Sequence, residues 1–384
     1  MTHETENTQF DMVMELLINN GFDGMAETMR IMMDSAMKIE RGRYLQAEPY
    51  QRTPARQSYA NGFKQKAIKT TAGEIMLAIP QTRDSRFYPS SLERGLRSER
   101  ALKIALAEMY IQGVSTRKVT KITEQLCGFE VTSSEVSRAS KELDVQLTSW
   151  RNRPLGAFSY VYLDARYEKV RHGGIVRSCA VLIAIGVNET GMREVLGISV
   201  ELSEQELHWR HFLSALKDRG LYGIKLFISD AHEGLHAARN AVFPTVPWQR
   251  CQFHLQQNAQ SYVPKQSMKQ EVADRIRAIF AAIDEQEAKR LLDLFIADYQ
   301  KTAPKLASWA EGAIPEGLVV LLMPQAHRRQ LRTNNMLERL NKEIKRRTRV
   351  ACIFPNTDSC LRLVTAVAME ISDDWETGKK YLNM

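Results

Sequence analysis

The spacing of hydrophobic residues divides the chain into a helical first part and a second part in which strands alternate with helices. Over residues 10–40 apolar side chains recur every three to four positions, and Gly21 with Asp23 separates two predicted helices. Methionines dominate the apolar stripe of the second helix. Because flexible thioethers fill irregular contacts, we expect this stripe to pack in a core or against a helix rather than bind a ligand.

A polar linker and a short hairpin are expected next. Residues 41–58 have the composition of a linker, and residues 64–83 predict two short strands around a turn at residues 72–74. The hairpin region is rich in basic side chains, namely Lys64, Lys66, Lys69, Arg83, Arg86, Arg94 and Arg97. Two interpretations remain open, a solvated face of the hairpin and a surface that contacts the DNA backbone.

Three helices are predicted within residues 99–146. Ser115 caps the second helix, and Ser133 opens a third that extends to about residue 147. Helices of this length joined by short turns fit a helix-turn-helix module, although three-helix bundles also occur without DNA. The exposed face of the third helix would carry two basic side chains, Arg138 and Lys141.

Strand patterns replace the helical spacing after residue 154. Five strands are predicted, over residues 158–163, 175–187, 193–200, 226–229 and 246–252. An amphipathic helix over residues 203–219, with Ser203 and Glu206 as its capping box, follows the third strand, and a short helix follows the fourth. Three strands, helix, strand, helix, strand is the order of elements in a ribonuclease-H-like core.

Helical spacing returns in the last third of the chain. Residues 265–320 predict an all-helical insertion, residues 331–350 an amphipathic helix, and residues 358–375 a final helix. The expected fold is therefore an α/β ribonuclease-H-like core with a helical insertion, preceded by a mostly helical DNA-binding region. The expected divisions are 1–60, 61–150, 151–264, 265–324, 325–350 and 351–384.

Composition and charge favour a soluble protein with a polyanionic partner. The 384 residues contain 53 Lys and Arg against 45 Asp and Glu, which gives a net charge of +8. Five scattered cysteines suggest reduced thiols in a cytoplasmic protein. The first residues are polar and acidic, unlike a secretory signal, and the longest apolar run, residues 180–187, is too short to span a bilayer.

Three carboxylates are candidate metal ligands. Asp164 and Asp230 each follow a predicted strand, and in the expected topology these strands are neighbours, so the two side chains would converge. Converging carboxylates repel unless a cation neutralises them, and Mg²⁺ prefers oxygen ligands. Glu338 is the candidate for the third, because it shares one helix face with three cations, Lys342, Lys345 and Arg349. Glu343 lies on another face and is the weaker choice.

Each acid also has a purely structural interpretation. An Asp at a strand end commonly caps a turn, and a Glu on a basic helix is usually an exposed ion-pair partner. The order Asp, Asp, Glu on strand, strand and late helix favours the functional interpretation.

Eight segments of the chain carry a recognisable pattern. They are MYIQGVSTRKV (109–119), SSEVSRASKELD (133–144), YVYLDARYEKVR (160–171), IAIGVNETGMREVLG (183–197), LKDRGLYGIKLFISDAHEGL (216–235), WQRCQFHLQQN (248–258), TNNMLERLNKEIKRRTRV (333–350) and FPN (354–356). In these segments the sequence resembles the mutator-type transposases of bacterial insertion sequences, which carry a DDE catalytic triad. The resemblance covers the chain from about residue 60, and the first 60 residues match little.

The resemblance implies that Asp164, Asp230 and Glu338 are the catalytic ligands of two Mg²⁺ ions, for which Mn²⁺ can substitute. It also implies that Cys251 and His254 form the family's Cys-x-x-His signature beside the active site. The expected activity is nicking and strand transfer at the terminal inverted repeats of an element, by a homodimer or larger assembly in the bacterial cytoplasm, associated with the nucleoid when bound to DNA. DNA contacts or active-site support are expected from further basic residues: Arg339, Lys342, Lys345, Arg346 and Arg347. The surface that binds the element ends is expected within residues 60–146.

Other functions compete for some of the same residues. His232 and His236 fit the H-E-x-x-H pattern of zinc metalloproteases, but Gly234 weakens a helix there, and no Asp or Glu occurs over residues 237–270 to supply a third ligand. Cys251 with His254 could be half of a structural zinc site, but no second pair at ligand spacing is present. A non-catalytic helix-turn-helix regulator would leave the long α/β region unexplained.

Overall fold

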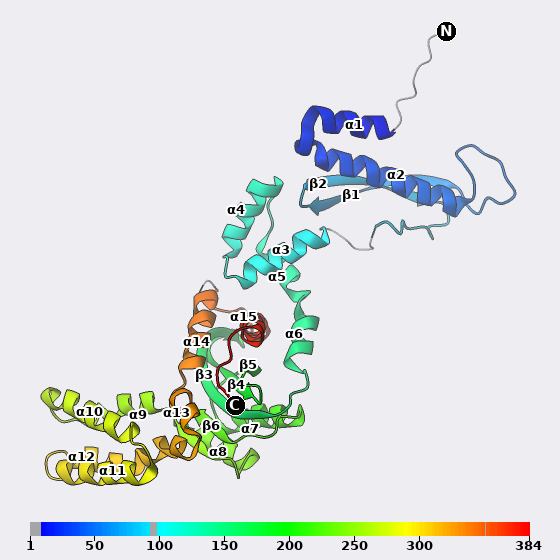
Figure 1. Ribbon diagram of the computed structural model, residues 1–384. Coiled ribbons are helices and arrows are strands. Elements are labelled where there is room, and N and C mark those ends of the chain that lie inside the picture. The colour runs from blue at the N-terminus through cyan, green and yellow to red at the C-terminus, as the bar shows by residue number, and fades with distance from the viewer. Residues whose placement is uncertain (1–8, 93–97, 350) are drawn as a thin grey trace. The chain divides into compact units, whose positions relative to one another are not determined.

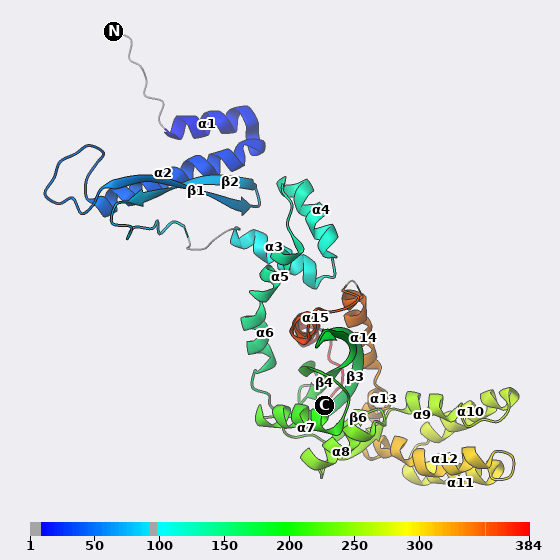
Figure 2. The same ribbon diagram turned by 180° about the vertical axis from the view of Figure 1, so that it is seen from behind.

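The computed structural model describes residues 9–92, 98–349 and 351–384, without the side chains of Gln9 and Arg100. The chain forms two compact units, Met1–Leu143 and Asp144–Met384. Figures 1 and 2 show the elements of each unit from opposite sides. Two of the expected basic residues, Arg94 and Arg97, lie outside the described residues.

The first unit begins with the two expected helices. These are α1 (Gln9–Asn20) and α2 (Met25–Leu45), separated by a 3-10 turn (Gly21–Gly24) in which Gly21 has a φ of 55°. Because α2 continues to Leu45, the first five residues of the predicted linker are helical. The packing role of the methionine stripe is confirmed for Met37, which is fully buried, but not for Met32, which is exposed.

An antiparallel hairpin packs against α2. Its strands are β1 (Ala60–Thr70) and β2 (Gly73–Thr82), and Met37 shares a core with apolar residues of both. The turn comes earlier than predicted, because Thr70 already pairs with Gly73. Lys69, one of the basic residues of the hairpin, lies 3.0 Å from Glu135 and ties the hairpin to the helices that follow.

Helices α3 (Arg100–Ile111), α4 (Thr116–Cys127) and α5 (Ser133–Lys141) complete the first unit around a small apolar core. Ser115 caps α4 as predicted, whereas the capping box of α5 is formed by Thr132 and Glu135 rather than by Ser133. The predicted third helix is too long. It ends at Lys141, and α6 (Asp144–Arg151) packs on α15 in the second unit, where Arg362 binds Asp144.

A mixed five-stranded sheet is the centre of the second unit. Its strands are β3 (Phe158–His172), β4 (Ile175–Asn188), β5 (Arg193–Glu201), β6 (Leu226–Ser229) and β7 (Trp248–Arg250). They lie in the order β5-β4-β3-β6-β7, with β3, β4 and β5 antiparallel and β3, β6 and β7 parallel. The first and fourth predicted strands, β3 and β6, are therefore neighbours, as expected.

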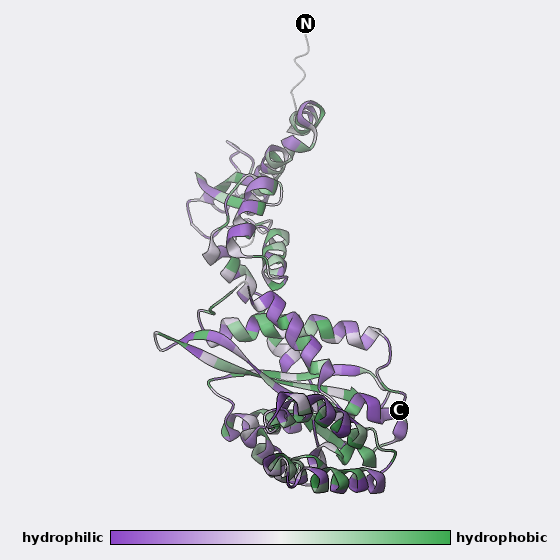
Figure 3. Cartoon of the chain, turned by 90° about the vertical axis from the view of Figure 1, so that its left-hand side faces the viewer, coloured by the Kyte–Doolittle hydropathy of each residue, from purple (hydrophilic) through white to green (hydrophobic). Residues whose placement is uncertain are grey.

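Helices cover both faces of this sheet. On one face lie α7 (Glu206–Asp218) and α8 (Glu233–Val242), and on the other lie α14 (Asn335–Thr348) and α15 (Thr357–Thr377) (Figures 1 and 2). Trp209, Leu213 and Leu216 recur at helical spacing and pack on the sheet, which explains why α7 forms there. The predicted capping box of α7 is absent, because Gln205 is the N-cap and no side chain caps the helix. In Figure 3 the middle of the sheet is hydrophobic, whereas the helices around it alternate hydrophobic and hydrophilic positions.

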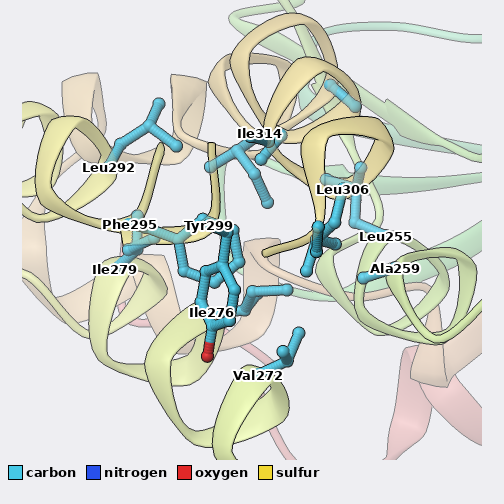
Figure 4. Packing of buried hydrophobic residues seen from close by; sticks show 14 of the residues in the cluster. Leu255, Ala259, Val272, Ile276, Ile279, Leu292, Phe295, Tyr299, Leu306 and Ile314 are labelled. Atoms are coloured by element: carbon cyan, nitrogen blue, oxygen red, sulfur yellow. The ribbon is translucent and has the colours of Figure 1, made fainter. Parts of the chain in front are cut away.

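An all-helical region, which extends beyond the expected insertion of residues 265–324 at both ends, lies between β7 and α14. Its elements are α9 (Gln252–Ala259), a 3-10 turn (Gln266–Met268), α10 (Lys269–Phe280), α11 (Glu285–Tyr299), α12 (Pro304–Ala313), two further 3-10 turns (Pro315–Gly317 and Val319–Leu322) and α13 (Gln325–Leu331). Figure 4 shows its own hydrophobic core, with Ile276 and Phe295 packed toward Leu306 and Leu255. Among the described residues, no helix combines the length and apolarity that crossing a membrane requires.

Candidate active site

Parallel pairing of β3 and β6 brings Asp164 and Asp230 to the same level of the sheet. Tyr160 pairs with Leu226 and Tyr162 with Ile228, so the next position on this face of each strand is an aspartate. Asp230 directly follows β6, as predicted. Asp164 does not end its strand: β3 continues to His172, because β4 supplies a pairing partner along the whole extension. The predicted strand end at Asp164 is therefore wrong, although the expected convergence with Asp230 is present.

Burial and repulsion make Asp164 an unusual carboxylate. Burial first, and then the negative charge of Asp230, raise its pKa to about 7. Its oxygens accept hydrogen bonds from the Ala165 amide, at 2.9 Å, and from Nδ2 of Asn341 on α14, at 2.7 Å. A cation between the two aspartates would relieve their repulsion.

His254 lies against Asp230. Its Nδ1 is 2.5 Å from Oδ1 of Asp230, as an ion pair rather than a well-aligned hydrogen bond. Interaction with Asp230, and then with Cys251, raises the pKa of His254 to about 10, so the imidazole is protonated at neutral pH. Ligand atoms of Asp230, Cys251 and His254 lie within 4.8 Å of one another, and in the described part of the chain no other three His, Cys, Asp or Glu residues come this close together.

The Cys-x-x-His segment begins a helix rather than ending a strand. Strand β7 stops at Arg250, and Cys251 is the N-cap residue of α9. The buried Cys251 thiol accepts a hydrogen bond from the Asn334 amide at 3.4 Å, and the Gln252 amide donates to the Arg332 carbonyl at 2.9 Å. These two bonds join the start of α9 to the start of α14 across the whole insertion.

Glu338, the expected third carboxylate, lies in the first turn of α14 with an exposed side chain. Among the described residues, no hydrogen bond or ion pair joins its side chain to either aspartate. The neighbours of Asp164 are instead Asn341, which lies three residues after Glu338 on the same helix, and Glu204, whose negative charge also raises the pKa of Asp164. The structure thus brings together two of the three predicted carboxylates.

The basic residues of α14 fall into two groups. The exposed ones are Arg339, Lys342, Lys345, Arg346 and Arg349, and Arg346 is paired with Glu343. Arg347 is only 5 % exposed and is held by Glu343 at 3.0 Å and Glu370 at 2.5 Å. The predicted phosphate contact from Arg347 therefore disagrees with the structure, because its guanidinium is already neutralised. In the first unit, Arg138 and Lys141 are exposed on α5 as predicted.

Two neighbours of the site were missed in the sequence. Asn341 could have been found from its position three residues after Glu338, which puts both on one side of the helix. Glu204 carried no such signal, because its approach depends on the loop between β5 and α7. Buried polar atoms of Asn334 and Asn341 also lack partners among the described protein groups, which suits a site that binds solvent, cations or DNA.

The histidine pair of the protease pattern does not form a metal site. His232 precedes α8 as its N-cap, outside the regular helix, and lies 3.7 Å from Glu204. His236 contacts Asn240 instead. A side chain at Gly234 would place its Cβ 2.8 Å from the Glu206 amide nitrogen, so this glycine permits the close approach of α8 to α7.

Comparison with known proteins identifies the family. The model of the family described as "Transposase, Mutator family" matches residues 1–378. The transposase for insertion sequence element IS406 of Burkholderia multivorans is 53% identical over 385 residues, covering 100% of this chain and 99% of the relative. The transposase for element ISRM5 of Rhizobium meliloti is 42% identical over 100% of this chain and 96% of its own.

A third relative is the transposase for insertion sequence element IS256 in transposon Tn4001 of Staphylococcus aureus, which is 39% identical over 90% of both chains. These matches favour neither the zinc metalloprotease nor the non-catalytic regulator. The family match spans nearly the whole chain, and each of these three relatives matches it over 90% or more of both chains. The chain belongs to the Mutator family of transposases.

Proposed function

We propose that this protein is the transposase of a bacterial insertion sequence, and that it cleaves and joins DNA at the terminal inverted repeats of its element. The observation that carries the proposal is the juxtaposition of Asp164 and Asp230 at neighbouring parallel strands, in a chain of the Mutator family. Double-stranded DNA of the element ends and of the target would be the substrates, acted on in the bacterial cytoplasm.

A ribonuclease-H-like core is the fold we infer for the second unit. The strand order β5-β4-β3-β6-β7, with three antiparallel strands followed by two parallel ones, supports it. Helices on both faces of the sheet and a helical insertion before α14 agree with the same architecture. In such mixed sheets, ligand sites lie outside the carboxyl ends of parallel strands, which is where Asp230 lies.

The donor set fits divalent metal ions that prefer oxygen ligands. Asp164 and Asp230 would hold them, with Glu338 as the proposed third ligand, and Mg²⁺ or Mn²⁺ suits such carboxylates. When bound, two ions would stabilise charge on the attacking and leaving oxygens of a phosphoryl transfer. Burial and then the repulsion from Asp230 raise the pKa of Asp164, and this supports the assignment, because a bound cation would offset both.

The residues of the chain hold and orient the reacting groups. Asn341 fixes one oxygen of Asp164, and His254 fixes one oxygen of Asp230. The exposed cations of α14, Lys342, Lys345 and Arg349, would bind phosphates next to the scissile bond.

In the first step a water oxygen bonds to phosphorus and the strand leaves with a free 3′-hydroxyl. In the second step that hydroxyl attacks a target phosphodiester, whose own bridging oxygen leaves.

Recognition of the element ends is assigned to the first unit. Helices α4 and α5, joined by the turn at Gly128, form the proposed helix-turn-helix, with Arg138 and Lys141 toward DNA. Pairing of two element ends requires a homodimer or a larger assembly.

The proposal is tested with four substitutions that remove charge and little else: Asp164→Asn, Asp230→Asn, Glu338→Gln and Glu204→Gln. Full-length protein is incubated with DNA that carries the element ends, with Mg²⁺ or with a chelator, and nicks are mapped. The first three variants should lose at least a thousandfold in nicking rate while still binding DNA. Glu204→Gln is the matched control and should retain most activity. Loss of activity in Glu204→Gln but not in Glu338→Gln would reassign the third ligand, and nicking by Asp164→Asn would refute the site.

A further inference from the structure

A groove in the first unit is lined by an excess of cations. It lies between the last turns of α2, the loop over residues 46–59 and the open end of the hairpin, and has a volume of about 1510 Å³. In Figure 1 this loop is the long blue excursion from the end of α2 back to β1. Six cations line the groove against one acid, Glu48. They are Lys38, Arg41, Arg43, Arg52, Arg56 and Arg83.

None of these six cations forms an ion pair with a carboxylate of the described residues. Exposed arginines elsewhere commonly do, as Arg30 does with Glu27 and Arg290 with Glu287. Arg41 is partly buried, which lowers its pKa, and its polar contact is with the Gly62 carbonyl at 3.3 Å. Unpaired cations gathered along one groove repel one another, and an anionic ligand would remove that repulsion.

Aromatic side chains alternate with these cations. The guanidinium groups of Arg56 and Arg83 lie 5.2 and 5.4 Å from the ring centroid of Tyr59, which is 57% exposed. Tyr50 is fully exposed. Its backbone φ of 63° is one that residues other than glycine rarely adopt. An exposed ring on a strained loop contributes nothing to the core of this unit, but offers a flat face to a ligand.

We propose that this groove binds single-stranded DNA, with phosphates along the arginines and a base stacked on Tyr50. A cationic groove with aromatic platforms is the arrangement by which proteins hold unpaired strands without reading their sequence. The inference rests on the proposed function, since nicking at an element end produces strands that can separate. It also gives a role to residues 38–59, all of which lie before the region expected to bind the element ends.

The test is a binding measurement on the full-length protein in chelator, where no cleavage occurs. The probe is a fluorescent single strand of about 12 nucleotides with arbitrary sequence, compared with a duplex of the same length. We expect the triple variant Arg41→Gln, Arg52→Gln, Arg83→Gln to weaken single-strand binding and to lower the salt slope of the binding constant by about 0.7 per lost phosphate contact. Tyr50→Ala should raise the single-strand Kd at least about fivefold and leave the duplex Kd unchanged.

A matched control removes the same charge from the insertion, with Arg275→Gln, Arg277→Gln and Arg290→Gln. If both triple variants weaken binding equally, general charge attraction explains it and the groove assignment fails. If wild type binds the duplex as tightly as the single strand, or Tyr50→Ala has no effect, the single-strand assignment fails. Should the groove triple variant unfold by circular dichroism, the loop substitution Arg52→Gln alone carries the same prediction. Failure of the proposed function would show differently, as intact binding without Mg²⁺-dependent nicking.

Discussion

At the residue scale, protein groups already hold the Asp164 carboxylate in place without a bound ligand. Both of its oxygens accept hydrogen bonds, from the Ala165 amide and from Asn341. The second bond crosses from the sheet to α14 and fixes the carboxylate in one orientation. Asn341 is therefore a positioning residue for the proposed metal ligand, acting through Asp164 rather than on the substrate.

Replacing Asn341 by alanine should slow nicking strongly and change the melting temperature little. Loss of a hydrogen bond to a charged group is worth about 1.5–3 kcal/mol, so we expect nicking at saturating Mg²⁺ to fall about tenfold to a hundredfold. Asn335→Ala removes an exposed amide from the same helix and serves as the control. Single-turnover nicking rates and thermal melting of both variants decide the matter. A wild-type rate for Asn341→Ala would mean that Asp164 needs no such support.

The sequence predicted those parts of the site that depend on the hydrophobic pattern of neighbouring residues. Asp230 follows a short apolar run whose length predicts a buried strand, and this placed Asp230 at the strand end. The extension of β3 beyond Asp164 was not predictable, because polar residues such as Arg171 pair there with β4 for reasons outside the local sequence. The contact between His254 and Asp230 was also hidden, since it depends on how α9 leaves β7.

At the element scale, α14 presents three different surfaces. Its apolar face was predicted correctly, because helical periodicity alone determines it: Met336, Leu337, Leu340 and Ile344 are all buried. Its exposed cations follow the outer face. Arg347 shows the limit of such reasoning, because its role is set by Glu370 on α15, an element distant in the sequence.

Arg347→Ala should destabilise the second unit without directly weakening DNA contacts. Removing one partner of a buried ion pair costs about 3–5 kcal/mol, and we expect about 1–3 kcal/mol here because the Glu370 side chain is 40% exposed. Arg346→Ala, which breaks an exposed pair with the same Glu343, should leave the free energy of unfolding nearly unchanged. Urea unfolding measures both. Reduced DNA binding with unchanged stability in Arg347→Ala would restore the phosphate contact expected from the sequence.

At the scale of the whole molecule, each of the two units carries a group of exposed cations, in a different structural setting. In the second unit, the exposed cations of α14 lie on the helix whose Asn341 holds a carboxylate of the site. In the first, unpaired cations line a groove with exposed tyrosines. The helices between β7 and α14, which belong to the second unit, have a hydrophobic core of their own, and continuous helical spacing in the sequence predicted helices there.

The bonds between the start of α9 and the start of α14 have a consequence for the covalent chain. The Gln252 amide donates a hydrogen bond to the Arg332 carbonyl, and the Asn334 amide donates one to the Cys251 thiol. These non-covalent contacts hold the parts of the site before and after the insertion together. Buried Gln249 adds to this by bonding the Gly317 carbonyl and the Val320 amide. A break in the backbone between α10 and α11 would leave all of these bonds, and the core they flank, intact.

We therefore expect residues 1–282 and 283–384, produced together as separate polypeptides, to assemble into one active enzyme. Co-purification through a tag on one fragment, followed by the nicking assay, measures this. A comparable break placed after Ser229 would separate Asp230 from its own strand and should give no activity. Failure of the first pair to assemble would mean that the uncut insertion is needed to hold the site. Success would make the insertion a permissive point of division, at which two separately regulated genes could supply a single catalytic centre.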